Sequence, residues 1–332
     1  MNLRAKFLFP FAMLATIHLY ADDGAASIAA GGIVVMGRET RIVMAKEVLQ
    51  ISARKVIVDY DFRNDSDEDI TTEVAFPIPP YEPGDEDITP SEQGFDDFRL
   101  WVDEVQTHYR IEARAFLKGK EFTQLLKSMH VDIASFGHAD STSVTPDIER
   151  LTDSQREQLK KTGLINYDYG GPNWQVRKKY YWKQTFPAHK SVHIKHIYSP
   201  RVGSFNSIKY GLGPGVEKYY DKTLNGFCID GRLHTTLQKI VNSKDKDAPF
   251  FYVDFILTTA NTWKTPIEDF TLIVERPHLK DSNHPSFASY VSFCWDGPIE
   301  KIDPDHFLAH AVSFIPKKEL TIGFFDVEKS VF

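Results

Sequence analysis

The sequence predicts a mainly β protein, built from antiparallel sandwich-like modules with a minor helical part inserted between them. Three observations lead to this fold class. Aromatic residues are frequent, with 24 Phe, 14 Tyr and 5 Trp. Short runs alternate between apolar and polar residues, with the period of a half-buried strand. Helical patterns, in contrast, are confined to four short segments.

The first strands are expected at 55–63 and 70–78, where alternate side chains are apolar. The polar stretch NDSDED lies between the two runs, and we therefore expect an antiparallel hairpin with one solvated face. Further strands are expected at 98–105 and 109–115.

Helices are expected in the middle of the chain, at 121–129 and 153–162. Thr152 and Gln155 form a capping-box pair at the start of the second helix, and Gly163 ends it. Two more helices are expected near 216–223 and 230–242; Asp230 is a suitable N-cap for the latter.

The β pattern returns after the middle region. One face of the run 174–186 is apolar and is interpreted as core, although its aromatic side chains would also suit a sugar-binding platform. That face carries Trp174, Val176, Tyr180, Trp182 and Phe186. Residues 191–198 are expected to run back as a second hairpin strand. The remaining strands are expected at 250–259, 270–275, 289–295, 307–315 and 320–326.

These elements suggest four segments. A signal peptide over 1–21 precedes an N-terminal β-sandwich-like module over 22–120. A helical insertion or linker over 121–171 follows, and a C-terminal β module with one helical excursion occupies 172–332. No flexible linker separates the two β modules, so one shared sheet system is an alternative.

The first residues resemble a secretory leader. Arg4 and Lys6 precede the apolar run Phe7–Leu19, which is too short to span a bilayer, and Ala21 offers a small residue for cleavage. We expect a periplasmic or secreted protein. Loss of Arg4 and Lys6 with the leader changes the net charge from −7 to −9, which argues against nucleic-acid binding. No membrane span is expected in the mature chain.

The chain has two cysteines, Cys228 and Cys294. In an oxidising compartment such a pair is expected to form a structural disulfide. The alternative makes Cys228, which lies just before an expected helix, a nucleophile with a lowered pKa.

Histidine and acid clusters were examined for metal binding. NDSDED has acids at alternate positions, but an EF-hand would need Gly and Glu where Ile70 and Phe76 stand. His189, His193 and His196 are spaced so that no two can chelate on one strand. His306 and His310 have helical chelating spacing within a strand-like segment. We expect no metal site and no cofactor.

Positive side chains of the 174–198 region suggest a basic face that would receive an anionic ligand or an acidic partner; the alternative is an ordinary solvated sheet face. The residues of this basic face are Arg177, Lys179, Lys183, His193 and Lys195. Sequence signatures of catalysis, such as G-x-S-x-G, H-E-x-x-H and the P-loop, are absent.

Several ordered stretches resemble an exported bacterial family, domain of unknown function 4424: DDGAA-SIAAGGIVV, FRNDSDEDITTEVAFPIP, YYWKQTFPA, YSPRVG, FCID, ILTTANTW and VSFCW. The resemblance implies an extracytoplasmic, β-rich protein with two cysteines placed as here, and it supplies no catalytic residues. Residues 48–80 also resemble, more locally, the vault and inter-alpha-trypsin inhibitor domain.

These observations favour a non-catalytic binding or scaffold protein that contacts an envelope protein or a cell-wall component. The alternative is a periplasmic hydrolase of glycans or peptides, in which the fold brings together acids such as Asp296 and Asp303.

Overall fold

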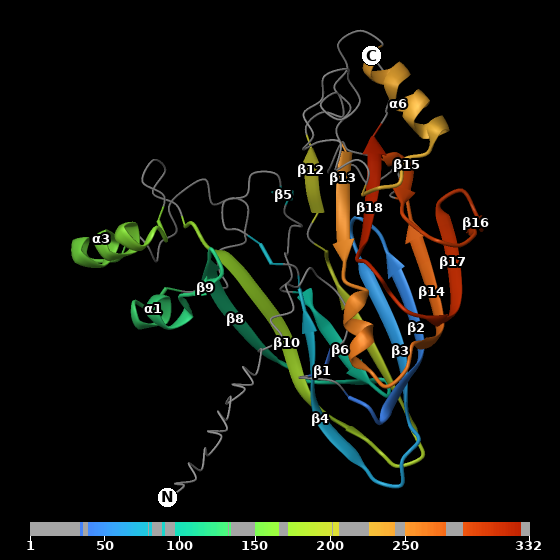
Figure 1. Cartoon of the computed structure of the whole chain (residues 1–332), viewed down its shortest axis with the longest axis horizontal. Coiled ribbons are helices and arrows are strands. Elements are labelled where there is room, and N and C mark those ends of the chain that lie inside the picture. Colours follow the sequence, from blue (N-terminus) through green and yellow to red (C-terminus); the bar gives the residue numbers. More distant parts are fainter. Residues whose placement is uncertain are drawn as a thin grey trace, which may run out of the picture.

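The computed structural model arranges the chain in three β-sheets with short helices at their margins (Figure 1). It describes residues 34–35, 39–78, 80–81, 88–89, 97–131, 133, 150–165, 172–200, 202–205, 226–242, 250–276 and 288–326. Strands are far more extensive than helices in these segments, so the predicted mainly β fold is confirmed.

The largest sheet, sheet B, has eight strands and combines early and late parts of the chain. All neighbours are antiparallel except β14 and β2, which are parallel. In spatial order the strands are β16 (Ile299–Lys301), β17 (His306–Phe314), β14 (Ile267–Glu275), β2 (Ile42–Ile51), β3 (Val56–Asn64), β11 (Ser191–Tyr198), β6 (Arg99–Val102) and β7 (Val105–Gln106).

The two smaller sheets have five strands each. Sheet A contains, in order, β1 (Val34–Val35), β4 (Ile70–Pro77), β10 (Gln175–Phe186), β8 (Arg110–Leu117) and β9 (Lys120–Glu121). Sheet C contains β15 (Ala288–Phe293), β18 (Leu320–Asp326), β13 (Phe250–Phe255), β12 (Val202–Phe205) and β5 (Ile88–Thr89), and its four longer strands lie in the upper part of Figure 1.

The described helices are α1 (Thr123–Ser128), α3 (Asp153–Thr162), α6 (Gly231–Asn242) and the 3-10 helix η2 (Thr258–Thr262). The capping box of Thr152 and Gln155 forms, and Gly163 ends α3 with φ of 77°. Asp230 caps α6 by accepting the N–H groups of residues 232 and 233. The expected helix at 216–223 lies outside the described residues.

Both predicted hairpins are wrong, and for one reason. β3 and β4 are consecutive in sequence, yet β3 pairs with β2 and β11 in sheet B, whereas β4 pairs with β1 and β10 in sheet A. β10 and β11 separate in the same way. Alternation buries every second side chain whether two strands pair or face each other across a sandwich, so it cannot distinguish these arrangements.

A buried asparagine links the two places where the chain passes from one sheet to the other, after β3 and after β10. The side chain of Asn64 donates from Nδ2 to the carbonyl oxygens of Glu68 and Phe186, each at 2.8 Å. Its backbone N–H donates to the carbonyl of Lys190. The turn after β3 is thereby tied to the turn after β10, and both pairs of strands enter the sandwich in register.

Aromatic side chains fill the space between sheets A and B. The rings of Phe98 and Tyr180 are parallel at 4.2 Å, and Phe62 and Phe186 contact edge to face at 5.7 Å. The predicted apolar face of 174–186 is buried throughout, as expected for core packing.

Strands from both predicted β modules share sheet B, because β14 from the C-terminal part pairs with β2 from the N-terminal part. The boundaries near 120 and 172 therefore mark changes in secondary structure. Their role as limits of independently folding units stays a prediction. No helix in the described part of the chain is long and apolar enough to cross a membrane.

Candidate functional site

The structure does not bring the predicted basic face together. Arg177, Lys179 and Lys183 lie on β10 of sheet A, whereas His193 and Lys195 lie on β11 of sheet B. The inward faces of these sheets pack against each other, so their outward faces point to opposite sides of the sandwich. A ligand role for either group stays a prediction.

Acidic neighbours compensate much of this positive charge. Lys179 Nζ lies 3.0 Å from a Glu112 oxygen, and Lys195 Nζ lies 3.1 Å from Asp59. His193 contacts Asp59 at 3.3 Å and a second aspartate at 2.9 Å. Exposed pairs of this kind contribute little to stability, but they reduce the field available to attract an anion.

Three other histidines form separate pairs with acids. Three pairs have nitrogen–oxygen distances of 2.8 Å: His189 with Asp67, His306 with Asp303, and His310 with Asp269. In the segments that the structure describes, no three His, Cys, Asp or Glu side chains are grouped closely enough to hold a metal.

Asp303, one of the acids considered for hydrolysis, shapes a turn. Its carboxylate accepts the backbone N–H groups of Asp305 and His306, each at 2.8 Å. The N–H of Asp305, with help from His306, lowers the pKa of this carboxyl. Such bonds hold the chain at the entrance to β17.

His196 lies in the core, away from any solvent. Its ring centroid is 5.0 to 5.7 Å from those of Tyr60, Phe76, Phe98 and Trp182. Neither ring nitrogen has a hydrogen-bond partner among the described residues, and burial lowers the pKa of the imidazole to about 3. The imidazole is therefore neutral and serves as one more ring in the aromatic layer.

Glu47 is a second buried ionisable group, which was not among the residues predicted from the sequence. It lies beside Tyr60 on β3 and Phe270 on β14 and is 2% exposed. Burial raises the pKa of its carboxyl to about 8. The only feature of the sequence that could have indicated its burial is its position. Glu47 lies three residues after Met44 and two before Leu49, which are both inward-facing.

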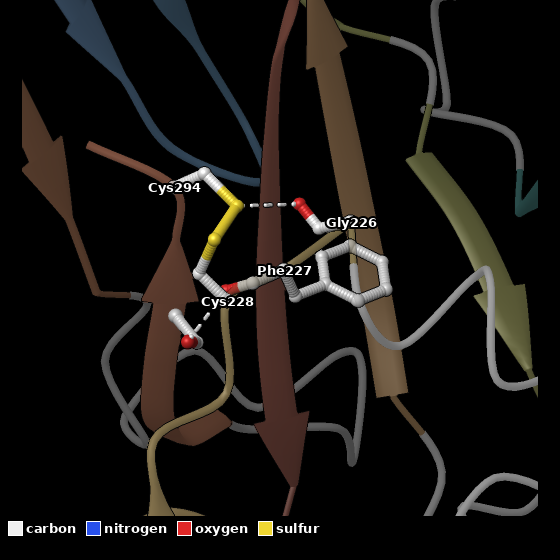
Figure 2. Close-up of a disulfide and its surroundings, with 5 residues drawn as sticks. Gly226, Phe227, Cys228 and Cys294 are labelled. Atoms are coloured by element: carbon white, nitrogen blue, oxygen red, sulfur yellow. Dashed lines mark hydrogen bonds between the residues drawn. A yellow bond between two sulfur atoms is a disulfide. The ribbon is translucent and has the colours of Figure 1, made fainter. Parts of the chain in front are cut away.

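The predicted disulfide is confirmed. Cys228 and Cys294 are bonded across a Cα–Cα distance of 5.0 Å (Figure 2). Cys294 Sγ lies 3.2 Å from the carbonyl oxygen of Gly226, and Ser292 Oγ donates to the carbonyl of Phe227 at 2.8 Å. The buried Phe227 ring packs against Phe325 of β18. The bond thus joins the segment before α6 to the end of β15 in sheet C, and the nucleophile alternative for Cys228 no longer applies.

Directly after Cys294 the chain forms one wall of a hollow, which we call the Trp295 cleft. It is bounded by residues 294–297, 310–315 and 317–320 together with Leu257, and its volume is about 410 Å³. Clefts that bind small ligands typically enclose roughly 300–1,000 Å³.

The floor of the Trp295 cleft is aromatic. Trp295 stacks on Phe270 at 5.7 Å and lies 5.3 Å from Phe314, which in turn stacks on Phe270 at 4.7 Å. The indole Nε1 of Trp295 is buried and has no hydrogen-bond partner in the segments that the structure describes. A Cβ on Gly297 would lie 3.0 Å from this nitrogen, so the glycine allows the close approach.

Apolar side chains are exposed around this cleft. Val312 is 70% exposed and Ile315 is 55% exposed, and both border it. Ile299 and Ile302, at the neighbouring strand β16, are 44% and 47% exposed. Exposed apolar side chains beside a cleft are typical of interaction sites. No sequence motif marks this site, because its two walls are brought together only by tertiary structure.

Fold and cleft together define a class: a mainly antiparallel β-sandwich protein with an apolar cleft beside a disulfide. Residues 21–322 match the family described as domain of unknown function (DUF4424), and the chain belongs to this family. The comparisons do not show the local resemblance to the vault and inter-alpha-trypsin inhibitor domain.

Two solved structures show a distant likeness to the chain. A Legionella pneumophila protein provisionally described as nutrient-binding is 13% identical with a TM-score of 0.42, over 89% of this chain and 70% of that one. The M1 zinc metallopeptidase of Deinococcus radiodurans is 7% identical with a TM-score of 0.29, over 86% and 43%. Neither likeness carries a functional argument. No curated protein matches the chain.

Proposed function

We propose that this protein is a non-catalytic binding or scaffold protein of the bacterial envelope, periplasmic or secreted after removal of the leader near Ala21. Its contact site is the Trp295 cleft. The observation that carries this proposal is a cleft of about 410 Å³ with an aromatic floor and an exposed apolar rim. A closed fold would bury such surface unless a ligand or partner used it.

The acids at the cleft favour binding over hydrolysis. A glycosidase needs two free carboxyl groups roughly 5–10 Å apart. Glu319 is occupied, because its carboxylate accepts the N–H groups of Leu257 and Thr258 and the Thr258 hydroxyl. Asp296 is exposed at the rim. This leaves a single available acid at the cleft among the described residues.

Export is supported by the disulfide, since such bonds persist in oxidising compartments. The partner is an envelope protein or a cell-wall component. It is recognised by the apolar cleft and not by the predicted basic face, several of whose basic side chains are paired with acids. No nucleic acid, metal or cofactor is part of the proposal.

The test is native mass spectrometry of the protein purified gently from its own periplasm. We expect wild-type protein to carry an added mass that Val312→Glu removes, since a charge would be placed at the cleft rim. Val105→Glu is the matched control, because Val105 is a similarly exposed valine (67%) on β7 at the opposite edge of sheet B. A bare chain in every preparation would overturn the proposal. A bound, cleaved glycan or peptide would favour the hydrolase instead.

A further inference from the structure

The edge of sheet B is incomplete along the Trp295 cleft. β17 pairs with β14 from Phe314 to His306, but on its other side β16 covers only Phe307–Ala309. On the β16 side, residues 310–314 of β17 have no strand beside them in the described part of the chain. This uncovered segment is one wall of the cleft.

The register shows which backbone groups are left open. Ile302 N–H donates to the carbonyl of His306, and Glu300 lies opposite Leu308. Backbone groups alternate between the two sides of a strand. The N–H and C=O groups of His310 and Val312 therefore face the same side as those of His306, toward the cleft.

Proline explains why β16 stops. Continuing the register of β16 would place Pro298 opposite His310. Proline has no N–H and cannot donate to the ladder. The chain from Trp295 to Pro298 leaves β17 and forms the opposite wall of the cleft, which the Cys228–Cys294 disulfide anchors.

The complement of a strand edge is another polypeptide backbone, because its donors and acceptors repeat at the same spacing. A guest strand beside residues 310–312 would project alternate side chains over the aromatic floor of Trp295 and Phe314. A sugar or a lipid would satisfy the apolar floor but not the row of backbone groups at His310 and Val312.

Charge at the end of the groove indicates an acidic guest. Lys317 and Lys318 border the cleft, both are exposed, and neither is ion-paired within the part of the chain that the structure describes. Asp296 is the one exposed acid at this site. The local balance is positive although the whole chain carries a net charge of −7.

We infer that the Trp295 cleft binds an extended segment of a partner protein, which adds to β17 as a strand, inserts an apolar side chain above Trp295 and places an acidic residue near Lys317 and Lys318. This inference rests on the proposed binding function and names its ligand class. The guest strand pairs with β17 from His310 onward, where the pairing with β16 ends at Pro298.

The test selects random heptapeptides with free carboxyl termini on the immobilised full-length protein, in parallel on wild type and on Val312→Pro. The proline removes one donor from the open edge and leaves the bonds to β14 unaffected, because those come from the other side of the strand. We expect peptides with alternating apolar residues and at least one acid, binding about tenfold more weakly to the variant. Hydrogen exchange of the β14–β17 amides verifies that the variant keeps its sheet.

A second measurement needs no protein variant. Selected peptides are resynthesised with N-methyl groups at alternate residues. In a strand pairing, methylation of the residues that face β17 weakens binding about tenfold, and methylation of the interleaved residues does not. Bound peptide should also slow amide exchange at His310 and Val312.

Three results would overturn the inference. The first is selection of the same peptides by wild type and Val312→Pro, with no alternation in the N-methyl series. The second is a concentration-dependent dimer that Val312→Pro dissolves, which would make a second copy the occupant. The third is slow exchange at His310 and Val312 without peptide, which would show that this chain covers its own edge. A cargo detected by native mass spectrometry would leave the binding function standing in each case.

Discussion

Two regions of this molecule are rich in aromatic side chains, and they differ in how their strands end. Between sheets A and B, β10 and β11 are paired on both sides, and rings such as Trp182 contact the buried His196 at 5.5 Å. At the Trp295 cleft, β17 loses its second partner after Ala309, and the rings of Trp295 and Phe314 lie under a hollow.

The difference shows that burial of a reactive side chain and availability of a site are separate properties. His196 and Glu47 have strongly shifted pKa values, yet solvent and ligands do not reach them, so their effect is on folding. At the cleft, in contrast, backbone groups and apolar side chains are accessible. Perturbed pKa values alone would have indicated the wrong region of this protein.

The largest expected effect on stability comes from removing the disulfide that anchors one wall of the Trp295 cleft. Replacing both cysteines, as Cys228→Ser with Cys294→Ser, frees a loop with a sequence separation of 66 residues. The chain-entropy relation gives a loss of about 4 kcal/mol in the free energy of unfolding. Guanidinium denaturation of the oxidised protein and the double variant measures it. A loss below about 1 kcal/mol would mean that sheet C holds this wall without the bond.

The next largest effect is the destabilisation caused by the buried Glu47, which increases with pH. In the unfolded chain Glu47 releases its proton near pH 4.5, whereas in the fold it keeps the proton to about pH 8. Stability is therefore lost as pH rises through this window, by roughly 3 kcal/mol at pH 7. We expect Glu47→Gln to gain this amount over wild type between pH 4.5 and pH 7, measured by urea denaturation at each pH.

The control for that series is Glu73→Gln, at an exposed position of β4. It should leave the pH dependence of wild type unchanged. If the free energies of unfolding of Glu47→Gln and wild type changed with pH in the same way, the Glu47 carboxyl would be ionised in the fold. That result would contradict the conclusion that Glu47 is buried and neutral.

His196 gives a smaller effect of opposite sign. The folded pKa of about 3 lies below the ordinary histidine value of 6.5, so stability is lost as pH falls below 6.5. At pH 5 the cost is roughly 2 kcal/mol. We expect His196→Phe to stay within about 1.5 kcal/mol of wild type at pH 7, and to gain the acid-dependent difference at pH 5.

The exposed His108 provides the matched control, as His108→Asn. A constant difference between His196→Phe and wild type from pH 7 to pH 5 would mean that the core admits a protonated imidazole. Since the Glu47 and His196 terms oppose each other between pH 4.5 and 6.5, each variant must be compared with wild type at the same pH.

The smallest expected change in stability is at the rim of the Trp295 cleft, and it distinguishes the cleft from the aromatic core between sheets A and B most directly. Val312→Glu alters an exposed side chain of the cleft, so the free energy of unfolding should change by less than about 0.5 kcal/mol. Val105→Glu at the other edge of sheet B should behave alike. Thermal unfolding tests both variants. A large loss for Val312→Glu alone would show that Val312 packs within the fold, and would leave no exposed rim for a partner.

Local patterns predicted individual elements well. The capping box at Thr152, the stop at Gly163 and the N-cap at Asp230 lie within a few residues of the helices they control, and all three are present. The buried face of β10 followed from alternation alone. Pairing of strands did not follow, because β3 and β4 bury the same side chains in a hairpin or across a sandwich.

The candidate site shows the same limit. Cys228 and Cys294 were identified as a pair by their number and compartment, which are properties of the sequence. Trp295, Val312 and Lys317 gave no joint signal, because a strand edge exists only after β16 and β17 have paired and Pro298 has ended the pairing. The basic residues gave a clear sequence pattern, but the fold placed them on two different sheets.

By itself, the sequence determined many of the strands and helices, which faces of those strands are apolar and that two cysteines are available to bond. Those properties depend on residues close together in the chain, where period and caps act directly. Tertiary structure alone decided which strands share a sheet, that Glu47 and His196 are buried neutral, and that β17 keeps an open edge. These depend on contacts between segments far apart in sequence, whose free energies exist only in the assembled fold.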